Sequence, residues 1–210
     1  MLDMVKVSPH AKLGRFKRRA LGPHMSRTHA FGRYAEIPVD KMSPEQKEGY
    51  QAMMESRGRL PGPNKIWIHN PKLAKMIGPF GAHFQPGKYS LSEREREIAV
   101  CVITSHWRSA YPTSAHERIG KQVGLPAAKV DAILCGLPTS FDDPREQVVY
   151  EMAIALTQGR WVPRGLYERA VKVLGHVSIT DVITLMGHYS SVAMTLAFYD
   201  VPDGATGMAR

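Results

Sequence analysis

Apolar residues recur at intervals of three and four positions along most of the chain beyond residue 40, and strand-type alternation is nearly absent. One predicted helical face carries Leu73, Met76, Ile77 and Phe80. Short loops separate the periodic segments, and short connections between helices favour antiparallel neighbours in a bundle. The pattern therefore predicts an all-α fold, an antiparallel helical bundle of at least six helices with essentially no sheet.

Helix start and stop signals set the expected boundaries. Ser43 and Ser92 each open a capping box, with a glutamine or glutamate three residues later, and Asn70 and Asp143 each precede a proline at the first helical position. Glycines follow several segments: Gly124, Gly136, Gly159 and Gly175. The expected helices span 44–57, 71 onward, 93 onward, the segment after a break at 109–112 up to 124, 127–134, 144–157, 163–174 and 178–198.

Length and composition favour one domain. The chain has 210 residues, and 43% of them are hydrophobic, which is enough for one sizeable core. We expect a helical domain over residues 25–210, preceded by a basic leader over residues 1–24. The leader holds six basic residues and one acidic residue, a net charge of +5. We interpret it as a disordered or artefactual tail, while a targeting segment and a true start at Met25 stay open as alternatives.

The distribution of charge argues against a nucleic-acid partner. The whole chain has a net charge of +9, so +4 is left after the leader. These charges are interspersed, as in the Glu-Arg-Glu-Arg-Glu run at 93–97, which is typical of a solvated helix surface. A basic stripe with interleaved aromatic residues is not found, so we expect no nucleic acid to bind.

Other patterns bear on location and cofactors. Cys101 and Cys135 lie 34 positions apart without a C-x-x-C pair, which favours a reduced, cytoplasmic protein. We find no apolar stretch of the roughly 18 residues that span a bilayer, and no secretory signal, so no membrane partner is expected. The nine histidines lack ligand spacing, so we expect no metal site.

Glu97 and His116 are the best candidates for chemistry. Glu97 precedes six apolar positions of its predicted helix, and a carboxylate on such a surface needs a partner. If the next helix returns antiparallel, Glu97 could accept a hydrogen bond from one nitrogen of His116 and leave the other for proton transfer. Ser109, Tyr111 and Thr113 in the intervening turn could supply hydroxyl groups. The alternative is a structural histidine and a glutamate that only complements the helix dipole.

The segments around this pair carry a family resemblance. Leu91-Ser-Glu-Arg-Glu-Arg-Glu-Ile98, then Tyr111-x-x-x-x-His116 and the turn Gly124-Leu125, resemble the core of the carboxymuconolactone decarboxylase and AhpD-like family. Members often read L-x-x-R-E-x-E and then Y-E-W-x-x-H. Further similar segments are Asn70-Pro-Lys-Leu, Gly78-Pro-Phe-Gly81, Gly187-His-Tyr189 and Phe198-Tyr-Asp-Val-Pro202. The likeness covers about residues 40–202.

The resemblance implies an AhpD-like all-α fold built on a two-helix antiparallel unit and assembled as a dimer, trimer or hexamer. Its peroxidase branch uses a C-x-x-C pair, and the matching positions here are Ser109 and Pro112. Neither residue can act as a thiolate nucleophile or as its resolving partner. The decarboxylase branch uses no metal or organic cofactor, but this chain has Pro112 and Thr113 where that branch usually has glutamate and tryptophan.

The resemblance therefore implies a cofactor-independent lyase that acts on a small carboxylated lactone or a keto-acid-like compound, as in aromatic compound catabolism. His116 would donate the proton and Glu97 would orient it. Arg108 or Arg118 could hold a substrate carboxylate, since guanidinium matches carboxylate bidentately, and His188 is a second candidate for the pocket. One alternative is a non-catalytic, oligomeric small-molecule-binding protein. A hydroperoxide reductase fits less well because C-x-x-C is absent.

Overall fold

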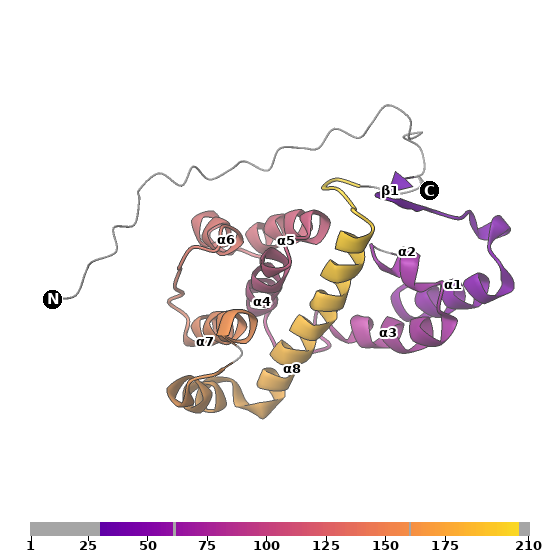
Figure 1. Cartoon of the computed structure of the whole chain (residues 1–210). Coiled ribbons are helices and arrows are strands. Elements are labelled where there is room, and N and C mark those ends of the chain that lie inside the picture. The colour runs from indigo at the N-terminus through magenta and orange to yellow at the C-terminus, as the bar shows by residue number, and fades with distance from the viewer. Residues whose placement is uncertain (1–29, 61, 160, 206–210) are drawn as a thin grey trace, which may run out of the picture.

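The computed structural model describes residues 30–60, 62–159 and 161–205, so the predicted leader lies outside the described residues. In chain order the elements are β1 (Ala30–Phe31), β2 (Tyr34–Ala35), a 3-10 turn (Val39–Lys41), α1 (Pro44–Arg57), α2 (Asn64–Trp67), α3 (Pro71–His83), α4 (Glu93–His106), α5 (Ala110–Gln122), α6 (Ala127–Leu134), α7 (Pro144–Ile154), a π-helical turn (Ala155–Gly159) and α8 (Arg164–Phe198). Strands β1 and β2 form one two-residue antiparallel pair. The all-α prediction is confirmed for the described part of the chain (Figure 1).

The predicted caps explain where the helices begin. The hydroxyl of Ser43 accepts from the backbone of Gln46, the hydroxyl of Ser92 accepts from the backbone of Glu95, and both capping boxes are complete. Some boundaries differ from the prediction. The helix expected over 144–157 ends at Ile154, and a π-helical turn follows it. The short helix α2 occupies part of an expected loop, and α5 begins at Ala110, inside the expected break.

Helix α8 contains two helical segments, as the glycine signal predicted. Gly175 has φ 72° and ψ 166°, a conformation outside the helical region that a residue with a side chain would rarely adopt. The chain therefore turns at Gly175, and the segment after it runs as a long, straight helix across the molecule (Figure 1).

The apolar residues form two cores instead of the single core that composition suggested. The larger core joins α4, α6, α7 and α8 around Ile98, Val149 and Leu185. The smaller core joins the β-strands, α1, α2 and α3 around Phe31 and Met53. The C-terminal half of α8 contributes Val192 and Leu196 to the smaller core, and Val182, Leu185 and Met186 to the larger one. Helix α8 therefore connects the two parts of the fold.

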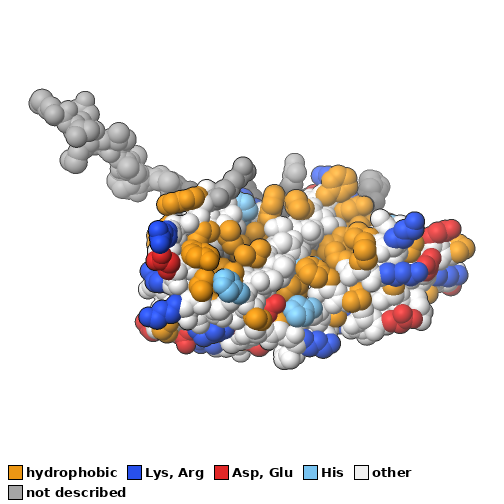
Figure 2. All heavy atoms as spheres, turned by 90° about the horizontal axis from the view of Figure 1, so that it is seen from below, with side chains coloured by type: hydrophobic (Ala, Val, Ile, Leu, Met, Phe, Trp, Pro, Cys, Tyr) orange, Lys and Arg blue, Asp and Glu red, His pale blue; other side chains and the backbone are white. Residues whose placement is uncertain are grey.

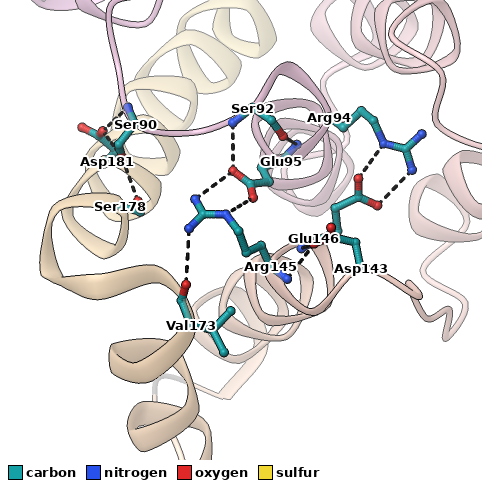
Figure 3. A network of polar contacts seen from close by, with 10 residues as sticks. All are labelled: Ser90, Ser92, Arg94, Glu95, Asp143, Arg145, Glu146, Val173, Ser178 and Asp181. Carbon is teal, nitrogen blue, oxygen red and sulfur yellow. Dashed lines mark hydrogen bonds and ion pairs between the residues drawn. The ribbon is translucent and has the colours of Figure 1, made fainter.

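Two ion pairs connect α4 to α7, and each helix contributes one arginine and one glutamate. Arg94 Nε lies 2.5 Å from Glu146 Oε1, and Arg145 Nε lies 2.6 Å from Glu95 Oε1 (Figure 3). Arg94 and Glu95 belong to the motif on which the resemblance rests, so this part of the motif positions α4. Arg145 also donates to the carbonyl of Val173, close to the turn at Gly175.

Among the described residues one helix, α8, is long and apolar enough to span a bilayer by length and composition, contrary to the expectation from the sequence. It packs against α4, α5 and α7, and the buried polar residues Ser178, Asp181 and His188 lie on it. Asp181 accepts hydrogen bonds from the backbone and the hydroxyl of Ser90 (Figure 3). A core helix that joins two apolar clusters accounts for the same composition.

Candidate functional site

The two principal candidates meet between α4 and α5. Nδ1 of His116 lies 2.7 Å from Oε2 of Glu97. Glu97 is 0% exposed and His116 is 7% exposed. Glu97 lies near the start of α4, whereas His116 lies in the middle of α5, so the antiparallel return of the chain brings them together. The expected hydrogen bond is therefore present, and it lies in the interior.

Arg96 binds the other oxygen of the same carboxylate. Its guanidinium contacts Oε1 of Glu97 and donates a 2.7 Å hydrogen bond to the hydroxyl of Tyr189 on α8. The Tyr189 ring meets the His116 ring at 88°, with the centroids 4.9 Å apart. Burial raises the pKa of Tyr189, so its hydroxyl keeps its proton at neutral pH. Glu97 is thus held from both sides, and Tyr189 limits the motion of His116.

This arrangement determines which nitrogen of His116 is available. A carboxylate only accepts hydrogen bonds when ionised, so Nδ1 carries the hydrogen that points to Glu97. Nε2 has no hydrogen-bond partner among the described residues. An imidazole with one nitrogen bound to a carboxylate and the other free can move a proton through the free nitrogen.

The three residues expected in the turn have different surroundings. Ser109 is 2% exposed, and its Oγ and the Oγ1 of Thr113 are buried without a hydrogen-bond partner. Thr113 precedes His116 by three positions and so lies on nearly the same face of α5. Tyr111 packs edge-on against Phe31, with the centroids 5.3 Å apart, and burial raises its pKa. Tyr111 therefore belongs to the smaller core.

The two arginines predicted to hold a carboxylate, Arg108 and Arg118, are both exposed. Arg108 is exposed at the turn before α5, with φ 50°. Arg118 is exposed, donates to Gln122 and lines an open surface groove of about 500 Å³ on α5. Residues two apart on a helix point to different sides, so Arg118 turns away from the side of α5 that carries His116.

His188 is buried where α3 and α8 meet. It is 8% exposed, and its ring lies 5.6 Å from the Tyr189 ring. Its Nδ1 is buried without a partner. Burial, together with the charges of Arg57 and Arg96, lowers the pKa of His188 to about 4, so it is neutral at pH 7. His188 thus adjoins the dyad of Glu97 and His116 through Tyr189.

Comparison with known proteins supports the fold. No protein-family profile matches the chain, and no curated protein sequence matches it. Among solved structures, the apo form of the debrominase Bmp8 is similar, with a TM-score of 0.57 and 18% identity over 77% of this chain and 87% of that chain. The chain therefore shares an all-α helical fold with that protein. At 18% identity this similarity shows the fold and nothing about activity.

Cys101 and Cys135 are both free, and they differ in exposure. Cys101 is buried on α4, where its thiol lies 3.6 Å from the backbone carbonyl of His116. Burial raises the pKa of the Cys101 thiol well above its usual range. Cys135 is exposed at the end of α6. Neither cysteine occupies the position of a reactive thiol beside the histidine.

Two site residues were not identified from the sequence. Arg96 lies in a run of alternating charges that was interpreted as solvated surface, yet its side chain is 14% exposed. Arg57 ends α1 and influences His188 on α8, a relationship that only the tertiary structure reveals. Tyr189 was named only as part of the Gly187-His-Tyr189 likeness. For Arg96, the apolar positions that follow it were the signal that its helix turn is buried.

A second open groove of about 460 Å³ runs between α4, the π-helical turn and α8. Its lining includes Trp107, Leu156 and Ile183, and neither this groove nor the one at Arg118 is lined by Glu97 or His116. Among the described residues no group of three or more histidine, cysteine or acidic side chains could hold a metal ion. The dyad is therefore the cluster to which chemistry is best assigned.

Proposed function

We propose that this chain is a cofactor-independent lyase of the carboxymuconolactone decarboxylase type. It acts on a small carboxylated lactone or keto-acid-like compound. The observation that carries the proposal is the buried 2.7 Å hydrogen bond between Glu97 and Nδ1 of His116, which leaves Nε2 free. Because the carbonyl-bearing substrate itself can delocalise charge, the protein has only to exclude water and to move one proton.

The proposed reaction is a decarboxylation followed by a proton transfer. The bond between the substrate carbon and its carboxylate breaks, CO2 leaves, and the electron pair passes into the neighbouring carbonyl as an enolate. Protonated His116 then transfers the proton on Nε2 to that carbon and becomes neutral. Glu97 stabilises the imidazolium before the transfer and fixes the orientation of the ring. Water returns the proton before the next turnover.

Burial of the dyad supports this chemistry. Loss of CO2 is faster when the carboxylate is removed from water, because the charge spreads as the bond breaks. Glu97 and His116 are almost entirely buried. Ser109 and Thr113 lie at the start of α5, the helix of His116, and their hydroxyl groups are buried without a hydrogen-bond partner among the described residues. We assign these hydroxyl groups to hydrogen bonds with the substrate oxygens.

Thiol chemistry is less well supported by the side chains. A hydroperoxide reductase needs an accessible thiolate with a second cysteine nearby. Cys101 is buried and Cys135 lies at the end of a different helix. Debromination, which the name of the similar structure specifies for that protein, is a separate activity to test on this chain.

The test is CO2 release from a panel of carboxylated lactones and 2-keto and 3-keto acids, with deuterium incorporation from D2O measured at the product carbon. We expect His116→Gln to reduce turnover by about 10²–10⁴-fold, a typical contribution for a general acid. Glu97→Gln should also reduce turnover while the protein stays folded. His106→Gln is the matched control, since His106 is exposed at the end of α4. Equal turnover in His116→Gln and His106→Gln would refute the assignment.

A second candidate is a small-molecule-binding protein without turnover. It is favoured by one observation, that neither described groove is lined by the dyad. Native mass spectrometry of the purified chain would then show a retained compound, and the panel would give no product and no deuterium exchange. His116→Gln would in that case alter retention of the compound only.

We also propose that the chain forms a homo-oligomer in the cytoplasm. Large apolar side chains are exposed, among them Phe198 at 74%, Val177 at 72% and Trp161 at 70%. Figure 2 shows apolar side chains gathered in patches on the face seen there. Patches of this kind support association between subunits. Light scattering at micromolar concentration is the test, and a strict monomer would contradict the proposal.

A further inference from the structure

Arg57 is a half-buried cation without a counter-ion among the residues that the structure describes. It ends α1, and it forms no ion pair with any described acidic residue. Its Nε is buried without a hydrogen-bond partner. A buried donor without an acceptor destabilises the folded state, and the effect is larger for a charged group. Such a group is retained when something else supplies the acceptor.

The guanidinium of Arg57 reaches His188 across Gly81 of α3. A Cβ placed on Gly81 would lie 2.3 Å from Nη1 of Arg57 and 3.2 Å from Nε2 of His188. Both nitrogens therefore lie against the same point of α3, and only a glycine leaves room for them. The absence of a side chain at position 81 thus lets the Arg57 guanidinium and the buried His188 ring both lie against α3.

Further unpartnered nitrogen atoms gather around His188. Nδ1 of His188 and Nε of Arg96 are buried without hydrogen-bond partners. Trp67, Phe80 and Phe84 surround the His188 ring, with centroid distances of 5.6–6.0 Å. Phe80 is 42% exposed, so this aromatic wall reaches the surface. Positive charge and hydrogen-bond donors therefore lie beside an apolar surface formed by these aromatic rings.

We propose that Arg57, Arg96 and His188 form a binding site for a carboxylate group attached to a planar, apolar body. Two guanidinium groups supply charge-assisted hydrogen bonds, and neutral His188 donates from one ring nitrogen. The aromatic wall contacts the apolar body. This site takes over the role that the sequence had suggested for Arg108 and Arg118.

The site lies next to the dyad, so it deepens the proposed function and rests on it for the identity of the ligand as substrate. Tyr189 contacts both His116 and His188, and Arg96 binds both Tyr189 and Glu97. A guanidinium stabilises a carboxylate against loss as CO2. The group held by Arg57 is therefore one that the reaction leaves in place, while the reacting carbon lies toward His116.

Calorimetric titration of the full chain with benzoate tests the site, and benzamide serves as the uncharged probe of the same shape. We expect benzoate to bind and benzamide to bind at least about tenfold more weakly. Arg57→Gln should weaken benzoate by about tenfold or more, as loss of a charge-assisted hydrogen bond implies. Lys47→Gln removes the same charge from an exposed position of α1 and should leave benzoate affinity unchanged.

Two further variants separate the position of the Arg57 guanidinium from its charge. Gly81→Ala should displace the Arg57 guanidinium and weaken benzoate without removing any charge, whereas Arg57→Lys should recover part of the affinity. Benzoate binding is measured without turnover, so a failed lyase assay leaves this test intact. Equal binding of benzoate and benzamide, or equal losses in Arg57→Gln and Lys47→Gln, would overturn the proposal.

Discussion

The imidazole of His116 meets the ring of Tyr189 at 4.9 Å, and the hydroxyl of the same tyrosine accepts a 2.7 Å hydrogen bond from Arg96. Because Arg96 also binds Glu97, the three side chains around His116 are linked to one another. The position of the proposed proton donor on α5 therefore depends on α8 as well as on α4. This relationship connects the dyad to the half of α8 that carries His188.

The first prediction concerns Tyr189→Phe. The ring contact with His116 should remain, while Arg96 loses its acceptor and Glu97 gains freedom to move. We expect the free energy of unfolding to fall by about 1–3 kcal/mol and turnover to fall through kcat, with little change in KM. Urea denaturation and saturation kinetics measure the two effects. A variant that is destabilised but has normal kcat would show that Tyr189 is structural only.

The second prediction concerns the two ion pairs between α4 and α7. A double-mutant cycle on Arg94 and Glu146 should give a coupling free energy of about 1–2 kcal/mol, because Glu146 is largely buried and its two oxygens both accept from Arg94. The exposed pair Arg164 and Glu168 on α8 is the control. Its coupling should not exceed about 0.5 kcal/mol. Similar couplings in both cycles would contradict the structural role of the first pair.

The helices and the dyad could be predicted because their signals are local. Ser43 and Ser92 open capping boxes within four residues of sequence, and Gly175 ends a helical segment by its own conformation. Glu97 and His116 are brought together by a short connection between consecutive helices. A tight antiparallel return needs no knowledge of the remaining chain.

Long-range relationships could not be predicted in this way. Arg57 and His188 are 131 positions apart, and their proximity depends on α3 lying between α1 and α8. Arg108 and Arg118 were chosen for being near His116 in sequence, but a helix distributes neighbouring residues around its axis. The division into two cores also depends on how α8 crosses the molecule, which periodicity does not specify.

The third prediction concerns the cysteines. Cys135→Ser should leave both stability and turnover unchanged, because Cys135 is exposed at the end of α6, a helix that carries neither Glu97 nor His116. Alkylation of the folded chain should label Cys135 much faster than Cys101, whose thiol is buried with a raised pKa. Mass spectrometry after timed alkylation measures both rates. Loss of turnover in Cys135→Ser would contradict this prediction and would indicate that the reaction uses a thiol.

The fourth prediction concerns stability in acid. The pKa of His188 is about 4 in the folded chain, lowered first by burial and then by Arg57 and Arg96, and about 6.5 when unfolded. Between these values the unfolded chain binds more protons, so stability rises with pH. The contribution is fully present above pH 6.5 and is lost as pH falls toward 4. It amounts to roughly 3 kcal/mol at most.

His188→Phe keeps a ring in the aromatic surroundings and removes the titration, so it should flatten the dependence of unfolding free energy on pH between 6.5 and 4. Asp181 does not interfere in that window. Burial acts to raise its pKa, but hydrogen bonds from Ser90 and His83 outweigh it and leave the pKa below 3.8. The stabilisation from Asp181 is therefore lost only at lower pH.

His106→Gln, at an exposed position, serves as the control. Urea denaturation at half-unit pH steps makes the comparison. If His188→Phe and the original chain lose stability in parallel from pH 6.5 to 4, His188 is not the group that makes this fold sensitive to acid.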